Sequence, residues 1–305
     1  MRLALVAFVL VLLLAGCAGT ARLTSAEKMI WSTYALATPR GMASCVIVNR
    51  PDPQAPNGVV PVIVTSAHVL SAAPHGPFYL IIREPRTGQN PTVGILQFQA
   101  PDPADRPFFQ HPRLDVAALE LRIPPEFSSD VSLVSFIDEK DIGAKSHEPH
   151  AGDEISVLGF PRIFAGTEGA FPVLRGGRIA SYSPGSVSDH EKFLVHTNVY
   201  GGDSGGPVFS GRRHGKPRLV GLVTERIGKK GESVPLAVVV NASAIRETLQ
   251  LQAKQERWYL GESAPSARPA PKSGVPLVGP ALESTAMPKA GKRIRFSLSH
   301  HRPGG

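Results

Sequence analysis

The sequence has little cysteine. Only two of its 305 residues are cysteines, and Cys17 lies at the end of an amino-terminal apolar run, which leaves Cys45 as the only thiol of the folded part. One thiol cannot make an intramolecular disulfide, so the fold must be stable without one. Cys45 lies in the apolar segment MASCVIV, which is typical of a buried structural cysteine rather than a reactive one.

The sequence also lacks an internal repeat and a sustained coiled-coil pattern, which excludes long helical architectures. Charged residues make up 19% and hydrophobic residues 42% of the chain, as in a globular protein with a sizeable core. Glycine (30 residues) and proline (29 residues) are plentiful. This composition favours many short strands joined by turns.

The amino terminus has the pattern of a targeting segment. Arg2 precedes an apolar run from Leu3 to Ala15, which is too short for a comfortable membrane span and has the length of a signal-peptide core. The run ends in Leu-Ala-Gly-Cys at Cys17, which resembles the lipobox of bacterial lipoproteins. The alternative is an ordinary secretory signal with an incidental cysteine.

The lipobox resemblance implies cleavage before Cys17 and a diacylglycerol on its thiol. Residues 1–16 would then be the signal peptide, and residues 17–27 the lipidated cysteine and a short linker. Ala18, rather than an aspartate, follows the cysteine. By resemblance to Gram-negative lipoproteins, this favours the periplasmic side of the outer membrane.

The carboxyl terminus differs from the rest in charge. Residues 261–305 hold seven Lys/Arg, two Glu and seven prolines. Such a segment cannot bury enough apolar surface to offset its ordering entropy, so the sequence predicts a disordered tail. The cluster from Lys289 to Phe296 is either a contact for anionic lipid or simply part of a solvated tail. We expect no nucleic-acid partner.

The body of the chain is strand-like, and the fold class predicted is all-β. The strand-like segments are MASCVIV, VVPVIVTS, FYLIIRE, TVGILQFQ, LDVAALEL, EISVLGF, FLVHTNV and RLVGLVT. A polar break at residues 138–152 divides them into two lobes, about 28–140 and 150–240. A helix over about 241–257 follows, with Asn241 as its cap. Ala242, Ile245 and Leu249 form its apolar face.

The stretch YGGDSGGPVF surrounds Ser204 with four glycines. A serine hydroxyl is a poor nucleophile unless a base takes its proton and a third group orients that base. His68 is the favoured base because it follows the apolar segment VIVTSA, whose small final residues leave room for an imidazole ring. His75 and His111 lie in proline-rich loops, and His196 lies within a strand.

Asp115 is the favoured orienting group. Apolar residues surround it in RLDVAALEL, and a partly desolvated carboxylate requires a fixed partner. Asp102 and Asp105 lie in the polar loop APDPADRP and rank lower. The chain order is therefore His68, Asp115, Ser204, which is the order of the chymotrypsin-type triad. The GDSGG sequence also fits the nucleophile elbow of α/β-hydrolases, but in those the acid and histidine follow the serine.

The segments TSAHVL, DVAALEL and GGDSGGPVF resemble the three active-site motifs of trypsin-like, chymotrypsin-fold serine peptidases. DEISVLGFPR and VLRGGRIASY resemble second-lobe strands of bacterial members, so the resemblance covers about residues 28–250. It implies two packed six-stranded-type β-barrel lobes in a peptidase domain of residues 28–260. It also implies an oxyanion hole from the amides of Gly202 and Ser204, and no metal or organic cofactor.

By the same resemblance, Asn198 lies at the base of the primary specificity pocket, and Thr224, Glu225 and Arg226 lie in its wall. A neutral pocket base predicts an uncharged residue before the cleaved bond. Arg226 either attracts acidic side chains or is merely solvated. The sequence has no activation site whose new amino terminus could pair with Asp203, so the partner of that carboxylate is left open.

The function predicted is a membrane-anchored serine endopeptidase that acts on proteins or peptides through an acyl-enzyme. The alternative is a catalytically silent lipoprotein of the same fold that works as a binding module. A structural envelope protein with a functional basic tail is a third possibility. The sequence gives no indication of oligomeric state.

Overall fold

A computed structural model describes most of the predicted peptidase domain. The described residues are 23–55, 57–74, 77–84, 92–98, 108–121, 135, 137–143, 149–162, 171–181, 190–210, 217–228, 234–259 and 293–295. Residues 1–16, predicted to be a signal peptide, Cys17 and most of the tail lie outside them. Within the described residues, no helix is both long and apolar enough to cross a membrane.

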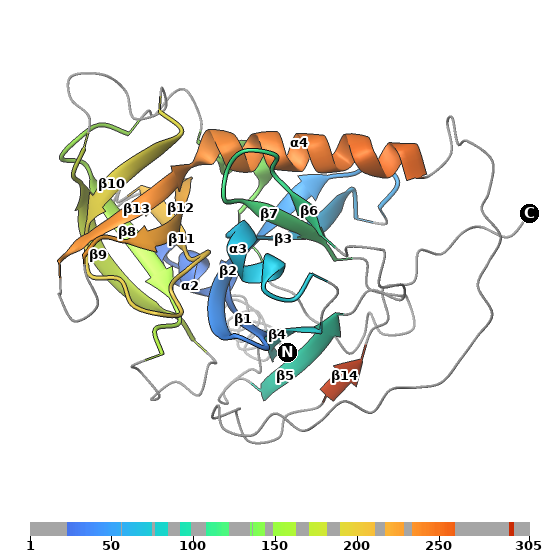
Figure 1. Cartoon of the computed structure of the whole chain (residues 1–305). Coiled ribbons are helices and arrows are strands. Elements are labelled where there is room, and N and C mark those ends of the chain that lie inside the picture. The colour runs from blue at the N-terminus through green and yellow to red at the C-terminus, as the bar shows by residue number, and fades with distance from the viewer. Residues whose placement is uncertain are drawn as a thin grey trace, which may run out of the picture.

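Two β-sheets form the body (Figure 1). The first has eight strands in the order β14-β5-β4-β1-β2-β3-β7-β6. These are β1 (Thr33–Thr38), β2 (Gly41–Pro51), β3 (Val59–Thr65), β4 (Phe78–Glu84), β5 (Thr92–Phe98), β6 (Phe109–Gln110), β7 (Ala117–Glu120) and β14 (Arg293–Arg295). The second sheet is a closed barrel in the order β10-β13-β12-β11-β8-β9. Its strands are β8 (Glu154–Gly159), β9 (Val173–Ile179), β10 (Lys192–His196), β11 (Pro207–Ser210), β12 (Leu219–Arg226) and β13 (Leu236–Asn241).

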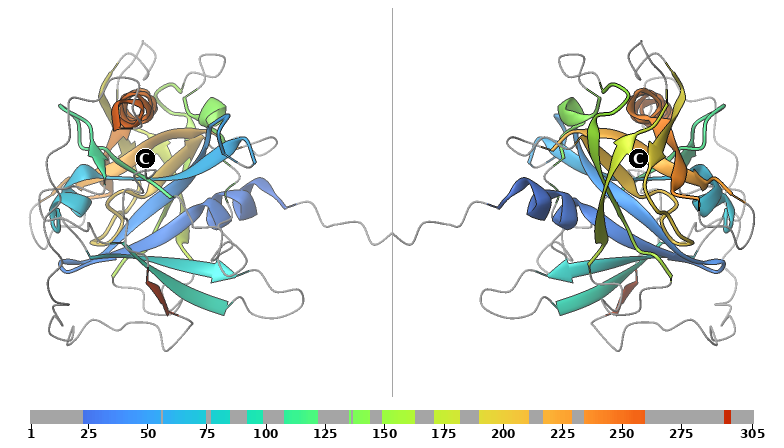
Figure 2. Two further views of the ribbon diagram at one scale, coloured as in Figure 1. Left: turned by 90° about the vertical axis from the view of Figure 1, so that its right-hand side faces the viewer. Right: turned by 90° about the vertical axis from the view of Figure 1, so that its left-hand side faces the viewer.

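The helices are few. They are α2 (Ser25–Ser32), α3 (Ala67–Ser71), the 3₁₀ helix η2 (Glu139–Asp141) and α4 (Ala242–Tyr259). In Figure 1, α4 runs from the barrel across to β6 and β7, and Figure 2 views it nearly end-on. These features confirm the predicted all-β fold of two packed lobes with a carboxy-terminal helix. The first lobe is an open sheet rather than a closed barrel.

Burial on both faces explains the continuous apolar run of β2. Cys45 and Ile47 face the core of the first lobe. Val46 and Val48, which alternate with them, face a second core shared by β3, the barrel and α4. Burial raises the pKa of the Cys45 thiol, consistent with a structural cysteine.

The carboxy-terminal helix forms as the sequence predicts. The side chain of Asn241 accepts a hydrogen bond from the amide of Ser243 at 3.0 Å, which caps the first turn. Ala242, Ile245 and Leu249 are buried in the shared core. This face therefore joins α4 to both lobes.

The structure differs from the sequence-based expectation at both ends of the domain. The first helix begins at Ser25 with a capping box at Thr24, before the expected start at residue 28. The tail was predicted to be disordered, yet residues 293–295 form β14, which pairs parallel with β5. That prediction is wrong for these three residues, because strand pairing needs only backbone groups and does not depend on an apolar core.

Candidate active site

His68 lies in the first turn of α3, directly after β3. Ser66, which precedes the helix, is fully buried, and its hydroxyl donates to the carbonyl of Val223 in β12 at 3.1 Å. The end of β3 is thereby attached to the barrel. The ring of His68 stays accessible, with 51% of its side chain exposed.

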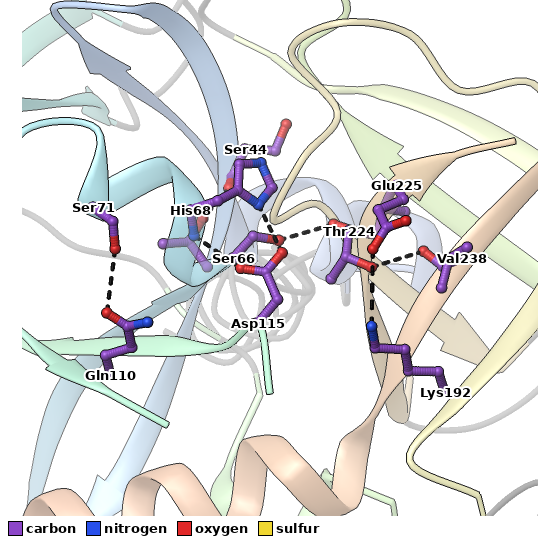
Figure 3. A network of polar contacts seen from close by, with 12 residues as sticks. Ser44, Ser66, His68, Ser71, Gln110, Asp115, Lys192, Thr224, Glu225 and Val238 are labelled. Carbon is purple, nitrogen blue, oxygen red and sulfur yellow. Dashed lines mark hydrogen bonds and ion pairs between the residues drawn. The ribbon is translucent and has the colours of Figure 1, made fainter. Parts of the chain in front are cut away.

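Asp115 holds His68 through two hydrogen bonds (Figure 3). Its Oδ2 lies 2.7 Å from the ring Nδ1, and its Oδ1 accepts from the His68 amide at 2.8 Å. Asp115 lies two residues before β7, so the strand begins later than the predicted strand-like segment LDVAALEL. The bonding geometry leaves Nε2, the other ring nitrogen, available for a different partner.

This pairing shifts the pKa values of both His68 and Asp115. The hydrogen bond to Asp115 raises the pKa of His68, while partial burial lowers it and the negative charges of Asp115 and Glu225 raise it further. Burial raises the pKa of Asp115, but the hydrogen bonds from the ring and amide of His68 outweigh it, so the pKa lies below its ordinary value. The pair therefore favours an ionised carboxylate beside an unusually basic imidazole.

The turn before Ser204 requires glycine. Gly202 has φ +105°, and a side chain there would meet the carbonyl oxygen of Phe160 at 2.2 Å. Gly205 has φ +79°, and a side chain there would meet the hydroxyl oxygen of Thr65 at 2.0 Å. Glycines thus let this turn pack directly against the end of β3.

Ser204 lies close to His68 through shared backbone contacts. The carbonyl of Val223 accepts from the hydroxyl of Ser66 at 3.1 Å and from the amide of Gly205 at 2.8 Å. The residue before His68's helix and the residue after Ser204 therefore meet at one oxygen. Within the described residues no hydrogen bond joins the side chains of Ser204 and His68.

Two amides of this turn have no acceptor. No residue that the structure describes accepts a hydrogen bond from the amide of Gly202 or of Ser204. Gly202 is buried and Ser204 is partly exposed. Two free donors beside a hydroxyl suit the stabilisation of a developing oxyanion.

The structure identifies the partner of Asp203 as Arg175 of β9. The two side chains form paired hydrogen bonds of 2.6 and 2.7 Å, and only 1% of the Asp203 side chain is exposed. Arg175 also donates to the carbonyl of Asn198 at 2.9 Å, and Asp203 accepts from the amide of Tyr200 at 2.7 Å. One guanidinium thus anchors the whole segment that leads to Ser204.

The expected specificity residues lie at the end of this segment and on β12. Asn198, Glu225 and Arg226 are exposed, whereas Thr224 is buried and its hydroxyl donates to Val238 at 3.3 Å. Thr224 occupies the register shift between β12 and β13. Beyond Val223, β12 pairs only with β13 among the described residues, so its other edge is open.

A cavity of about 390 Å³ adjoins the histidine–aspartate pair on the side of the first lobe. It is lined by Ala67, His68, Ser71, Gln110, His111, Pro112, Arg113, Leu114 and Asp115. The side chains of Ser71 and Gln110, which both line it, are joined by a 3.2 Å hydrogen bond (Figure 3). The cavity therefore offers polar groups next to the ring of His68.

The other candidate residues have different surroundings. His111 is buried, and its Nδ1 accepts from the amides of Arg113 and Leu114 at 3.2 and 2.9 Å, which shapes the loop before Asp115. His196 is exposed at the end of β10. His75, Asp102 and Asp105 lie outside the described residues.

The closed six-stranded barrel and the open sheet packed against it are consistent with a chymotrypsin-like fold. The family model for the trypsin-like peptidase domain matches residues 43–222, more than half of the chain. The chain belongs to the trypsin-like peptidase family. No curated protein sequence matches it.

Solved structures also resemble the chain. One is the inactive form of a serine-to-alanine mutant of Rv3671c from M. tuberculosis H37Rv, with 18% identity, coverage of 75% of this chain and 90% of that chain, and a TM-score of 0.42. Another is a serine-to-alanine mutant of the HtrA-type protease AlgW with a tripeptide, with 16% identity, coverage of 74% and 62%, and a TM-score of 0.45. This chain spans less than two thirds of that AlgW chain.

Proposed function

We propose that the chain is a membrane-anchored serine endopeptidase that uses His68, Asp115 and Ser204 as its catalytic triad. The observation that carries the proposal is the double hydrogen bond between Asp115 and His68, beside a serine whose turn offers two unpaired amides. Orientation of the base, a nucleophile and oxyanion donors are the parts that acyl transfer requires.

In the proposed reaction, Ser204 Oγ attacks the peptide carbonyl carbon while Nε2 of His68 takes the hydroxyl proton. The amides of Gly202 and Ser204 stabilise the oxyanion. When the tetrahedral intermediate collapses, the imidazolium returns the proton to the leaving amine and an acyl-enzyme remains. Water then attacks the acyl carbon while His68 takes its proton, the ester bond to Ser204 Oγ breaks, and the imidazolium returns the proton to Ser204 Oγ as the acid leaves. Asp115 stays ionised and stabilises the imidazolium throughout.

The open edge of β12 beyond Val223 supports a substrate that adds as an extended strand. Asn198 offers a neutral group at the proposed pocket base. We therefore propose cleavage after uncharged residues. The substrates proposed are proteins or peptides, and the proposed chemistry requires no metal or organic cofactor.

The proposed anchor is a lipid on Cys17, on the periplasmic side of the outer membrane. Thr24, the helix cap, lies seven residues after Cys17, so seven residue spacings join the two. Even fully extended, they reach at most about 25 Å. The peptidase would then work close to the membrane surface. Metabolic labelling with palmitate tests the anchor: label in wild type and its loss in Cys17→Ala support it, and an unlabelled mature wild type refutes it.

A fluorophosphonate probe tests the enzyme proposal without knowledge of the substrate. Purified mature protein should form a covalent adduct and hydrolyse casein, and Ser204→Ala should do neither. Ser210→Ala is a matched control, since this serine lies in β11 away from the site. Equal hydrolysis by wild type and Ser204→Ala, with no labelling of either, would instead support a silent binding module.

A further inference from the structure

The two peptide groups that carry the free amides are held by their carbonyl oxygens. Gly201 O accepts from the amide of Arg162 at 2.7 Å, and Asp203 O accepts from the amide of Gly206 at 2.8 Å. In a trans peptide group, the N–H points opposite to the C=O. Because these two carbonyls are fixed, the amides of Gly202 and Ser204 point away from the amides of Arg162 and Gly206 that hold them.

The peptide group between them is held differently. Its carbonyl, Gly202 O, accepts from the side-chain hydroxyl of Ser44 at 2.7 Å. Its amide, on Asp203, donates to Tyr200 O at 3.0 Å. The three successive carbonyls of Gly201, Gly202 and Asp203 thus each accept a hydrogen bond. Only the donor to the middle carbonyl, Gly202 O, belongs to a side chain.

Ser44 lies in β2 and is fully buried where the two lobes meet. Its hydroxyl oxygen also accepts from the amide of Phe160 at 2.9 Å, and its own amide donates to Ser204 O at 2.9 Å. Its carbonyl accepts from the hydroxyl of Thr65 at 2.8 Å, just before the helix of His68. Ser44 thus connects the turn of Ser204 with both lobes; Figure 3 draws it in the same view as the histidine–aspartate pair.

We propose that Ser44 is a positioning residue for the oxyanion-binding turn. Its hydroxyl fixes the middle peptide group, and this keeps the amides of Gly202 and Ser204 directed at one point. The role needs one side chain that donates and accepts at once in a space closed to larger groups, and serine satisfies both conditions. The inference deepens the proposed function and rests on it.

The first experiment compares Ser44→Ala, Ser44→Cys and a control, Thr248→Val. Thr248 is also fully buried, but its hydroxyl bonds only within α4, to Ala244 O at 2.6 Å. For Ser44→Ala we expect kcat to fall about 10- to 100-fold with KM within twofold, because the loss is confined to the transition state. Ser44→Cys, with a weak donor and acceptor, should lie between Ala and wild type.

A peptide boronic acid sharpens the comparison. Its boron accepts Ser204 Oγ and becomes tetrahedral, which mimics the intermediate. Its affinity should fall by the same factor as kcat in Ser44→Ala and by less than twofold in Thr248→Val. If Ser44→Ala fails to fold, Ser44→Cys carries the test. Turnover and boronate affinity within twofold of wild type in the folded Ser44 variant would overturn the inference, as would equal losses in Thr248→Val.

A structural measurement separates this inference from the proposed function. The amide of Asp203 should exchange with solvent at least tenfold faster in Ser44→Ala, because its peptide group loses its carbonyl anchor, and at the wild-type rate in Thr248→Val. This result does not require activity. If wild type takes up no fluorophosphonate, the proposed function fails, and unchanged exchange at Asp203 would independently refute the role of Ser44.

Discussion

Each lobe contributes one charged pair to the candidate site, and the two pairs differ in exposure. In the first lobe, His68 and Asp115 have 51% and 23% of their side chains exposed. In the second, Arg175 and Asp203 have 15% and 1% exposed. The first pair is open to solvent, whereas the second is enclosed. Under the proposed function, the exposed pair transfers the proton and the enclosed pair supports the turn that carries Ser204.

The largest expected effect breaks the exposed pair. Asp115→Asn keeps the shape of the side chain but can hold the imidazole in the wrong tautomer, a change worth about 10⁴ in kcat in the chymotrypsin-type triad. We expect a similar loss in casein hydrolysis, with little change in melting temperature. Combination with Ser204→Ala should add almost nothing, because the triad acts as a unit.

Asp153→Asn is the matched control. This carboxylate is exposed, and among the described residues the one hydrogen bond that it accepts comes from the amide of His150 at 2.9 Å. It should keep wild-type turnover. A loss of less than tenfold in Asp115→Asn would contradict the assigned role of the exposed pair.

The next effect breaks the buried pair. Arg175→Met leaves the carboxylate of Asp203 buried without its cation, and such a loss typically destabilises a protein by about 3–5 kcal/mol. Urea denaturation should show this decrease in the free energy of unfolding. Arg178→Met is the control on the same strand. Arg178 pairs with Glu154 at 3.3 Å, and 62% and 55% of the two side chains are exposed. We therefore expect this change to lower the free energy of unfolding by at most about 1 kcal/mol.

The double variant Arg175→Met with Asp203→Asn separates charge from packing. Removing the unpaired charge should recover more than half of the lost stability, while activity stays low because the guanidinium that joined Asp203 to the carbonyl of Asn198 is gone. If Arg175→Met unfolds no more easily than Arg178→Met, the buried pair is not the support of this segment.

A smaller effect concerns pH. The proposed mechanism needs neutral His68, and the pKa of this residue is raised, so activity should fall as pH decreases through a midpoint above the ordinary histidine value of about 6.5. Glu225 contributes to the raised pKa, so Glu225→Gln should move the midpoint of kcat/KM to lower pH. Glu154→Gln, away from the ring, should leave it in place. An upward shift in Glu225→Gln would contradict the electrostatic explanation.

The exposed pair could be predicted from the sequence, and the buried pair could not. His68 and Asp115 each follow or precede an apolar strand, and their order relative to Ser204 matches a known triad. Arg175 lies in the segment VLRGGRI of β9, most of whose residues are exposed or only partly buried. Such a strand gives no sign that one of its arginines pairs with a buried carboxylate. Its proximity to Asp203 depends on the register of β8 and β9, which pairs Val157 with Arg175. No local pattern encodes that register.

Fold prediction shows the same limit. Continuous apolar runs identified β2 and β3 because both faces of these strands are buried. β1 (Thr33–Thr38) is not among the predicted strands, although it is buried throughout, because TYALAT mixes small and polar residues. β13 (Leu236–Asn241) is not among them either, although its LAVVV is a continuous apolar run. Ser44 was read only as part of an apolar run. Its hydrogen bonds reach partners 116 and 158 residues away, which only the tertiary structure brings together.

A further effect concerns specificity. A digest of a peptide library should be dominated by cuts after uncharged residues, because Asn198 is neutral. Asn198→Asp should add cuts after Lys or Arg, since the new carboxylate lies at the proposed pocket base; Asn49→Asp, on β2, should not. Wild-type cuts mainly after Lys or Arg would refute the assignment and would favour a role for Glu225 in the pocket.

The smallest effect on catalysis is expected from the tail. β14 pairs with β5 at the edge of the first sheet, and β4, β1 and β2 separate β5 from β3, which precedes His68. A chain that ends at Gly261 should therefore hydrolyse peptides within twofold of wild type.

Removal of β14 leaves the backbone of β5 unpaired on that side, and an open edge favours pairing with a second chain. We expect the shortened protein to self-associate in size-exclusion chromatography with light scattering, whereas a chain that ends at Arg302 and keeps β14 should not. A large loss of turnover in a shortened protein that remains monomeric would show that the tail belongs to the catalytic unit.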